Sequence, residues 1–155
     1  MRNLVLVAIG VAWSGLQFGT LWIMFTSIVP LLNSRGAQEY LDACQGIKMD
    51  FFHPIALWGG VAMMVNGAFL ATQLNESGAQ LTAAGAALCM LGVGIVSETQ
   101  NRPLWRKLER WTLAELPSNW QELRTFWGNM HTLRTAFAFL GLALFTATMV
   151  IEYAP

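Results

Sequence analysis

The sequence predicts an all-α integral membrane protein, built as a four-helix bundle with amphipathic interfacial connector helices. Hydrophobic residues make up 55% of the 155 residues and charged residues only 12%, which is about half the charged share of an average soluble domain. Four nearly uncharged stretches are each long enough to cross a bilayer as a helix. None of them has the polar stripe that a helix in a soluble bundle shows. The length fits a single transmembrane domain, residues 1–155.

The charge balance excludes several other classes of protein. Lys and Arg number 9 and Asp and Glu number 9, so the chain lacks the basic excess of a nucleic-acid-binding protein. High hydrophobicity with low charge is the opposite of a disordered composition. Two cysteines, Cys44 and Cys89, are too few for a disulfide scaffold, and their separate locations predict free thiols. The expected partner is the lipid bilayer, with no nucleic acid.

The four uncharged stretches define the predicted spans. Because lipid offers no partner for backbone polar groups, each span must pair these groups internally and is expected to be helical. The second span contains no charged residue apart from His53, and the fourth contains Arg134 near its start. The spans are predicted at about residues 4–32, 51–72, 79–98 and 131–152.

Small residues in two of the spans predict close contacts between helices. Gly15 and Gly19 form a GxxxG pair in the first span, and Gly85 and Gly92 lie among alanines and glycines in the third. Such surfaces let helix backbones approach closely. The GxxxG face is also the predicted contact of a homo-oligomer.

The two long connectors are expected to be helical as well. Residues 36–48 are weakly amphipathic, and Pro103 suits the first turn of an interfacial helix over residues 103–113. Ser118 followed by Gln121 has the spacing of a capping box, which predicts a helix that starts there and runs into the fourth span. In the interfacial helix, Leu104, Trp105, Leu108 and Trp111 share one face, and Arg106, Lys107 and Arg110 share the other.

The basic residues predict the orientation of the chain. With four spans, the two long connectors lie on one side of the membrane and both termini on the other. The positive-inside rule then makes the connectors cytoplasmic and the termini external. A compact chain of this kind suits a bacterial inner membrane. The connectors carry Arg35, Lys48, Arg102, Arg106, Lys107, Arg110 and Arg124, whereas the opposite side has only Arg2.

Topology also gathers polar residues at the cytoplasmic end of the bundle. The second span starts there, the third ends there and the fourth starts there. Trp127, His131 and Arg134 follow an i, i+4, i+7 spacing and therefore share one helix face. Polar residues at membrane depth are costly and usually functional, so we predict a small-molecule site at this depth. Its polar residues are His53, Glu98, Asn101, Arg102, His131 and Arg134.

One chemistry that fits these residues is general base catalysis. A histidine would remove a proton, polar side chains would stabilise a developing oxyanion, and aromatic rings would hold a flat, apolar substrate. The candidate catalytic residues are His131, Arg134, Asn101 and His53, and the candidate substrate-binding residues are Trp127, Trp105, Arg102 and Trp58.

The second chemistry is metal-dependent oxidation. His53, Glu98 and His131 together form the set of two histidines and one carboxylate that non-haem iron oxygenases use. Iron or copper is the runner-up cofactor on this hypothesis. No HxxxH or HxxE spacing in the sequence supports it.

Four segments give the chain a resemblance to a known family. They are Ser27-Ile28-Val29-Pro30 at the end of the first span, His53-Pro54 at the start of the second, residues 99–105 after the third and residues 127–135 at the opening of the fourth. The last two segments, TQNRPLW and WGNMHTLRT, are the most specific. On these segments the chain resembles the anthrone oxygenase family of small four-span membrane proteins.

The resemblance implies an oxygenation that needs no cofactor. An anthrone carries an acidic C–H group between two aromatic rings, para to its carbonyl. A base removes this proton, and the enolate passes an electron to O₂ on the way to a quinone. The resemblance implies that His131 is the base, that Arg134 and Asn101 hold the enolate oxygen, and that His53 assists proton transfer. The substrate is expected to be an apolar aromatic or quinone-type molecule.

Two alternatives to this function remain open from the sequence. One is a non-catalytic membrane protein that binds a lipid-like ligand or a partner subunit, which the basic, Trp-rich connector would suit. The other is the metal-dependent membrane oxidase described above.

Overall fold

A computed structural model describes residues 2–47 and 53–153, and for residues 53–56 it describes the backbone alone. The first helical rod consists of α1 (Arg2–Ile23), the π-helical segment η1 (Met24–Ile28) and α2 (Val29–Asn33). The second rod is α4 (His53–Ala71), and the fourth is α7 (Trp120–Tyr153). The third rod consists of α5 (Glu76–Cys89), the π-helical segments η3 (Met90–Ile95) and η4 (Ser97–Asn101), and α6 (Arg102–Leu108). The connectors contain α3 (Ala37–Gly46) and a 3₁₀ turn, η5 (Leu113–Glu115).

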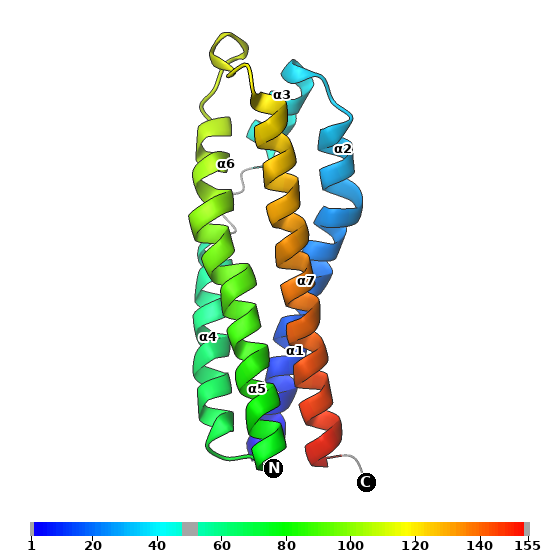
Figure 1. The fold of residues 1–155 in the computed structure, drawn as a ribbon, viewed down its shortest axis with the longest axis vertical. Coiled ribbons are helices and arrows are strands. Elements are labelled where there is room, and N and C mark those ends of the chain that lie inside the picture. Colours follow the sequence, from blue (N-terminus) through cyan, green and yellow to red (C-terminus); the bar gives the residue numbers. More distant parts are fainter. Residues whose placement is uncertain (1, 48–52, 154–155) are drawn as a thin grey trace.

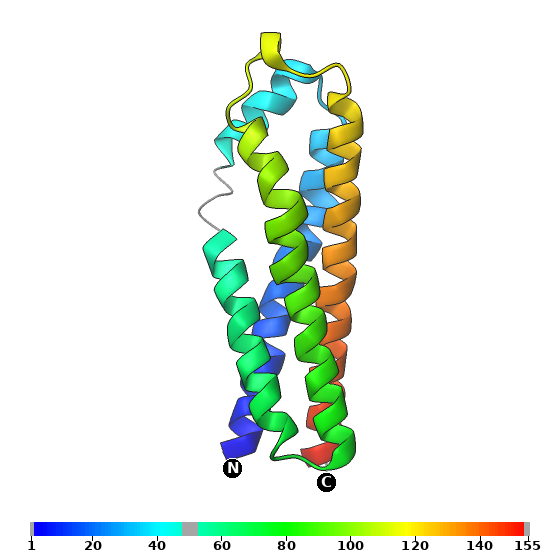
Figure 2. The same ribbon diagram turned by 60° about the vertical axis from the view of Figure 1, so that its left-hand side comes forward.

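The predicted all-α membrane bundle is confirmed. The four rods run side by side, with both described ends of the chain at one end of the bundle and α3 at the other (Figures 1 and 2). Three continuous helices, Arg2–Asn33, Glu76–Leu108 and Trp120–Tyr153, are long and apolar enough to cross a membrane. In α4 the described apolar part, Leu57–Ala71, is shorter. The membrane crossing of the second span therefore stays a prediction.

Glycines mark where α5 and η3 approach α7 most closely. A Cβ atom built on Gly92 would overlap the Cβ of Phe137, and one built on Gly85 would lie 3.2 Å from the Phe145 ring. This confirms the predicted contact surface of the third span. The GxxxG pair of α1 behaves differently, because a Cβ on Gly19 would meet nothing within 4 Å and one on Gly15 only Leu142 at 3.8 Å. That face makes no close helix contact within the described chain, and the homo-oligomer through it stays a prediction.

The predicted interfacial helix over residues 103–113 is wrong. Helix α6 continues the third rod without a break, and the rod ends at Leu108 (Figure 1). Pro103 is compatible with this path because it lies in the first turn of α6, directly after the π-helical η4, where the lost N–H is tolerated. In contrast, α3 (Ala37–Gly46) lies within the predicted connector helix over residues 36–48, the last of which is outside the described residues.

The predicted capping box at Ser118 and Gln121 is also misplaced. A capping box forms instead at Thr112 and Glu115, where the Glu115 carboxylate accepts from the Thr112 hydroxyl at 2.9 Å and from its N–H at 3.2 Å. Helix α7 begins at Trp120 and runs without interruption into the fourth predicted span, as expected.

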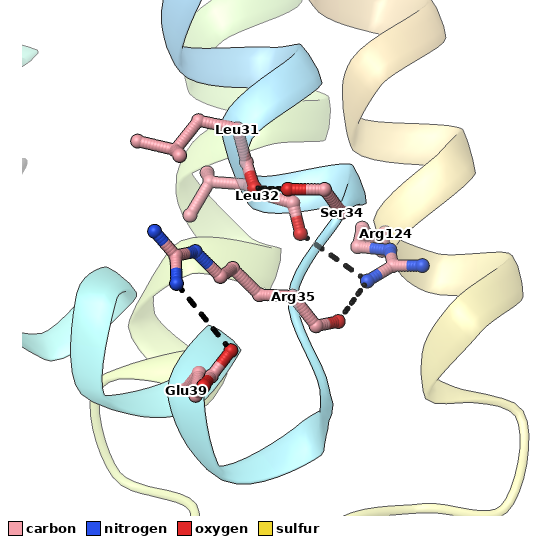
Figure 3. Close-up of polar contacts among 6 residues, drawn as sticks. All are labelled: Leu31, Leu32, Ser34, Arg35, Glu39 and Arg124. Carbon is pink, nitrogen blue, oxygen red and sulfur yellow. Dashed lines mark hydrogen bonds and ion pairs between the residues drawn. The ribbon is translucent and has the colours of Figure 1, made fainter.

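A compact cap closes the end of the bundle opposite the termini. Its centre is a buried cluster from α2, α3, α6 and the start of α7. Arg124 ties the α2–α3 corner to α7: its Nη1 donates to the carbonyl oxygens of Leu32 at 3.2 Å and Arg35 at 3.0 Å (Figure 3). The guanidinium also lies over the rings of Trp120 at 4.7 Å and Tyr40 at 5.6 Å. The cluster, hereafter the cap, consists of Val29, Leu32, Tyr40, Leu41, Cys44, Leu104, Trp105, Leu108 and Trp127.

Candidate functional site

Four buried polar side chains of the third rod and α7 lie at one level of the bundle, next to the cap. Ser97 and Asn101 come from η4, and His131 and Arg134 come from α7; their exposed fractions are 0%, 2%, 1% and 6%. Two contacts fix their common level. Gly92 meets Phe137 on one side of them, and Trp105 meets Trp127 on the other. We call Ser97, Asn101, His131 and Arg134 the polar layer.

A single hydrogen bond orients the His131 ring. Its Nε2 lies 3.2 Å from the carbonyl oxygen of Leu21 in α1. A carbonyl oxygen can only accept, so Nε2 carries the hydrogen, and the neutral ring keeps an unprotonated lone pair on Nδ1. This Nδ1 is buried and has no hydrogen-bond partner among the described residues. His131 is therefore held in the tautomer that a general base at Nδ1 requires.

Aromatic rings stack over His131 on the side of the cap. Trp127 lies one turn before His131 on α7, and the two rings stack with centroids 5.5 Å apart. Trp105 of α6 packs against Trp127 with centroids 5.4 Å apart. Both tryptophans are almost fully buried, with exposed fractions of 1% for Trp105 and 2% for Trp127. Two of the three predicted substrate-binding tryptophans thus form the side of the cap that faces His131.

Several polar atoms at this level lack partners in the described part of the chain. They are both side-chain amide atoms of Asn101, the Ser97 hydroxyl, Arg134 Nε and the Trp105 indole nitrogen. A buried polar group without a partner costs about 1–3 kcal/mol, and native proteins contain few of them. Here they belong to residues at the same level of the bundle as His131, whose Nδ1 also lacks a partner among the described residues. A ligand with oxygen atoms would supply the missing partners.

Two other predicted residues of this region form an ion pair. Arg102 Nη1 lies 2.6 Å from Glu98 Oε2, and each side chain is 22% exposed. The i, i+4 spacing places the pair on the partly exposed side of the helix, beside the polar layer and not within it. Arg102 is thus committed to Glu98 and is a weaker candidate for contact with a substrate.

The two remaining predicted residues are His53, of which the structure describes only the backbone, and Trp58, whose side chain it also describes. His53 begins α4, which packs against η4, but its side chain lies outside the described part of the molecule. Trp58 is 68% exposed and lines a groove of about 330 Å³ between α1 and α4, together with Trp13 and Asn66. The structure does not bring Trp58 to the polar layer.

The metal hypothesis depends on His53, whose side chain lies outside the described part of the molecule. No group of three His, Cys, Asp or Glu side chains suited to a metal occurs among the described residues. A metal at His131 would have to bind Nδ1, because Nε2 is engaged by Leu21. Glu98 is already paired with Arg102. The proposed set of His53, Glu98 and His131 stays a prediction.

Sequence reasoning missed two components of the site. The first is the Leu21 carbonyl, which a sequence pattern cannot identify because every residue has one. The second is Ser97, which lies one turn before Asn101 on the same buried face. The i, i+4 spacing from Asn101 was the available signal for Ser97.

One comparison with known proteins covers the part of the chain that contains these residues. A family model described as anthrone oxygenase matches residues 47–144, more than half of the chain. The match includes the whole polar layer as well as Trp105 and Trp127. No curated protein and no solved structure is significantly similar to the chain.

Proposed function

The chain belongs to the anthrone oxygenase family, and on that premise we propose that it is a membrane oxidoreductase that uses O₂. Its proposed substrate is an apolar aromatic or quinone-type small molecule that binds at the polar layer. The observation that carries the proposal is the hydrogen bond from His131 Nε2 to the Leu21 carbonyl, which leaves a buried, unprotonated Nδ1. A base in this position can remove a proton from carbon when the resulting anion is stabilised nearby.

The first proposed step is proton transfer from the substrate. His131 Nδ1 takes a proton from the acidic C–H group of an anthrone, and the electron pair of that bond moves onto the carbonyl oxygen. The unpartnered donors of the polar layer, Arg134 Nε–H and the Asn101 amide, would bind this enolate oxygen. Donors that are already in place cost no reorganisation when the charge develops, and they act more strongly where water is excluded. His53 is proposed to assist the proton transfer.

The second step is oxidation by O₂. The enolate gives one electron to O₂, and the two radicals combine to form a carbon–oxygen bond. The proton on His131 then passes to the peroxide. Loss of the second hydrogen from the same carbon breaks the O–O bond and releases water. The balance is one anthrone and one O₂ to one anthraquinone and one water, and no metal or flavin is required.

The test is oxygen uptake by the purified protein after a chelator wash, with anthrone as substrate. The wild type should consume O₂ above the spontaneous rate. His131→Ala should reduce the enzymatic rate by at least about 10²-fold, the lower range for loss of a general base. Thr132→Ala is the matched control, because its hydroxyl bonds only to the Gly128 carbonyl of its own helix.

Each outcome decides between the proposals. Uptake that survives in His131→Ala contradicts the role of the base. Activity that disappears on chelation and returns with iron or copper favours the metal-dependent oxidase. A wild type without uptake that still binds anthraquinone favours the non-catalytic ligand-binding protein, a second candidate that the same unpartnered atoms support.

A further inference from the structure

The groove between α1 and α4 lies apart from the polar layer. It has a volume of about 330 Å³ and an almost entirely apolar lining. Trp13 lines the groove, whereas Leu21, whose carbonyl oxygen binds His131, lies eight residues further along α1. At the rise of an α-helix, the two levels are about 12 Å apart. The groove is therefore a site of its own.

A glycine shapes the groove for flat molecules. A Cβ atom built on Gly59 would overlap the Trp13 ring, so the missing side chain is what lets the indole lie against α4. The neighbouring Trp58 also lines the groove and is exposed. Aromatic side chains offer large apolar faces on which rings stack. An aromatic ring therefore fits this groove better than a flexible chain does.

Two polar atoms of the lining side chains have no partner in the described part of the chain. Trp13 Nε1 is a donor and Asn66 Oδ1 is an acceptor, and both atoms are buried. The other amide atom of Asn66, Nδ2, donates to the Leu6 carbonyl at 3.1 Å, which identifies the oxygen as the unpartnered atom. One donor together with one acceptor matches a hydroxyl group, because a hydroxyl group accepts and donates at once.

The directions of the two helices bring these side chains toward each other. Asn66 meets Leu6 at one level and Gly59 meets Trp13 at another, as antiparallel helices require (Figure 2). Helical side chains lean toward the N-terminus of their own helix. Trp13 therefore leans toward the level of Asn66, and Asn66 leans toward the level of Trp13. One ligand oxygen between the two levels can serve both atoms.

The depth of the groove limits its occupant. Trp13 lies nine residues into the first predicted span, residues 4–32, which is about 13 Å at the helical rise. Since the hydrocarbon core of a bilayer is about 30 Å thick, the groove lies in its interior. A charged phospholipid headgroup is too costly at this depth. The hydroxyl group must belong to a neutral, largely apolar molecule that dissolves in the bilayer.

We propose that the groove between α1 and α4 is a second binding site, and that it takes a phenol, a flat aromatic ring with a hydroxyl group. The ring packs on Trp13 and Trp58. The hydroxyl oxygen accepts from Trp13 Nε1, and its hydrogen is donated to Asn66 Oδ1. The inference does not depend on the proposed oxygenase function, because the groove shares no residue with the polar layer.

The test compares a phenol with its methyl ether in the detergent-purified protein. The probes are 6-fluoro-2-naphthol and its methyl ether, and fluorine NMR gives each Kd after correction for partition into empty micelles. Methylation keeps the acceptor oxygen and removes the donor. The wild type should therefore bind the phenol about threefold to tenfold more tightly than the ether, the range of one hydrogen bond.

Substitution of the two polar side chains should give two different results. Asn66→Leu removes the acceptor, so the phenol and the ether should bind equally well. Trp13→Phe removes the donor that both ligands use, so both should bind about threefold to tenfold more weakly. The preference for the phenol should remain in Trp13→Phe, because the Asn66 oxygen is still present.

Two further variants locate the bound ligand. Ala62 lines the groove at an exposed position, so Ala62→Phe should fill the groove and abolish the binding of both probes. Ala68→Phe is the matched control, because Ala68 is exposed on the same helix outside the lining of the groove. His131→Ala should leave both Kd values unchanged, since the polar layer is a separate site.

Three results would overturn the proposal. They are a wild type without saturable binding, equal Kd values for the phenol and its ether, and binding that survives Ala62→Phe. Asn66→Leu also loses the bond to Leu6. If that variant does not fold, the comparison of the two probes in the wild type and in Trp13→Phe decides in its place. A protein that binds the phenol in the groove but consumes no O₂ supports this inference while the oxygenase proposal fails.

Discussion

The Cys44 thiol and the Tyr40 hydroxyl are buried in the cap, outside the membrane-spanning helices. Burial raises the pKa of Cys44 to about 12, because a thiolate would lose its hydration there. Burial also raises the pKa of Tyr40, and the neighbouring Cys44 adds to this shift. Both cysteines are free, as predicted from the sequence. The Cys44 thiol and the Tyr40 hydroxyl therefore keep their protons at neutral pH.

This environment predicts a cysteine that does not react in the folded protein. The thiolate is the reactive form, so Cys44 should resist maleimide at pH 7–8 in mild detergent and react once the chain is unfolded in SDS. Mass spectrometry of the Cys44 peptide measures the labelled fraction. Labelling of the folded protein as fast as that of the unfolded chain would show that the cap is open.

The raised pKa of Cys44 makes the stability of the folded protein depend on pH. An unfolded thiol loses its proton near its ordinary pKa of about 8.5, whereas folded Cys44 keeps its proton up to about pH 12. The unfolded state binds fewer protons between these values, so stability falls as the pH rises through this window. Thermal unfolding at pH 7 and pH 10 should show the loss, and Cys44→Ala should have a smaller one. An equal loss in both proteins would exclude Cys44 as its source.

At the level of residues, helical spacing predicted which side chains of α7 share a face. His131 and Arg134 share a face with Trp127, and the structure buries all three together. Ser97 was not predictable in the same way. Its hydroxyl has no partner among the described residues, and the π-helical turns around it are not visible in an apolar sequence.

Helix elements are the next scale, and here the close approach of η3 to α7 is a testable feature. Gly92→Ala would place a methyl group against the Cβ of Phe137. Overpacking of this kind costs about 1–3 kcal/mol, so thermal unfolding in detergent should shift to lower temperature. Gly19→Ala is the matched control, because nothing lies within 4 Å of the added atom. It should be neutral or slightly stabilising, since alanine is the better helix former. Equal effects of the two substitutions would contradict the packing.

The α2–α3 corner depends on one side chain of α7. Arg124→Lys keeps the charge but loses the fork that reaches the carbonyls of Leu32 and Arg35. Hydrogen bonds from a charged donor contribute about 1.5–3 kcal/mol each, so amide hydrogen exchange should accelerate in α2 and α3. Arg35→Ala is the control: it removes only an exposed ion pair with Glu39 at 3.6 Å, which contributes little, and keeps the backbone carbonyl (Figure 3). Faster exchange in the control alone would contradict this role of Arg124.

The positions of the helices were predicted well in the uncharged stretches of the sequence. They were predicted poorly where a helix continues beyond its apolar stretch. Uncharged runs located the rods because a bilayer requires them. The end of the third rod was missed because Pro103 and the basic residues after it resemble a new interfacial helix. In the structure, the same residues extend the rod, and its basic side chains Arg106 and Lys107 are exposed. The direction of a helix depends on tertiary packing, here that of Leu104, Trp105 and Leu108 in the cap.

For the whole molecule, the cap and the polar layer form one unit at one end of the bundle. The cap covers the layer with Trp105 and Trp127 and separates it from the solvent beyond α3. Hydrogen bonds that would hold an enolate act more strongly where water is excluded. Below the layer, Leu21, Val93 and Ala138 form an apolar cluster that continues the membrane-spanning core. An apolar substrate would therefore be held between two apolar regions, with its oxygens at the polar layer.

The end of the bundle that holds the polar layer is predicted to face the cytoplasm. The basic residues Arg35, Arg106 and Arg124 belong to that end, whereas Arg2 lies at the opposite end with both termini (Figures 1 and 2). Under the positive-inside rule, alkaline phosphatase fused to the C-terminus should be active and green fluorescent protein fused there should be dark. The same reporters inserted after η5 should give the reverse result. A fluorescent C-terminal fusion would invert the orientation and place the site at the outer face. Termini on opposite sides would mean an odd number of crossings, which would exclude α4 as a membrane span.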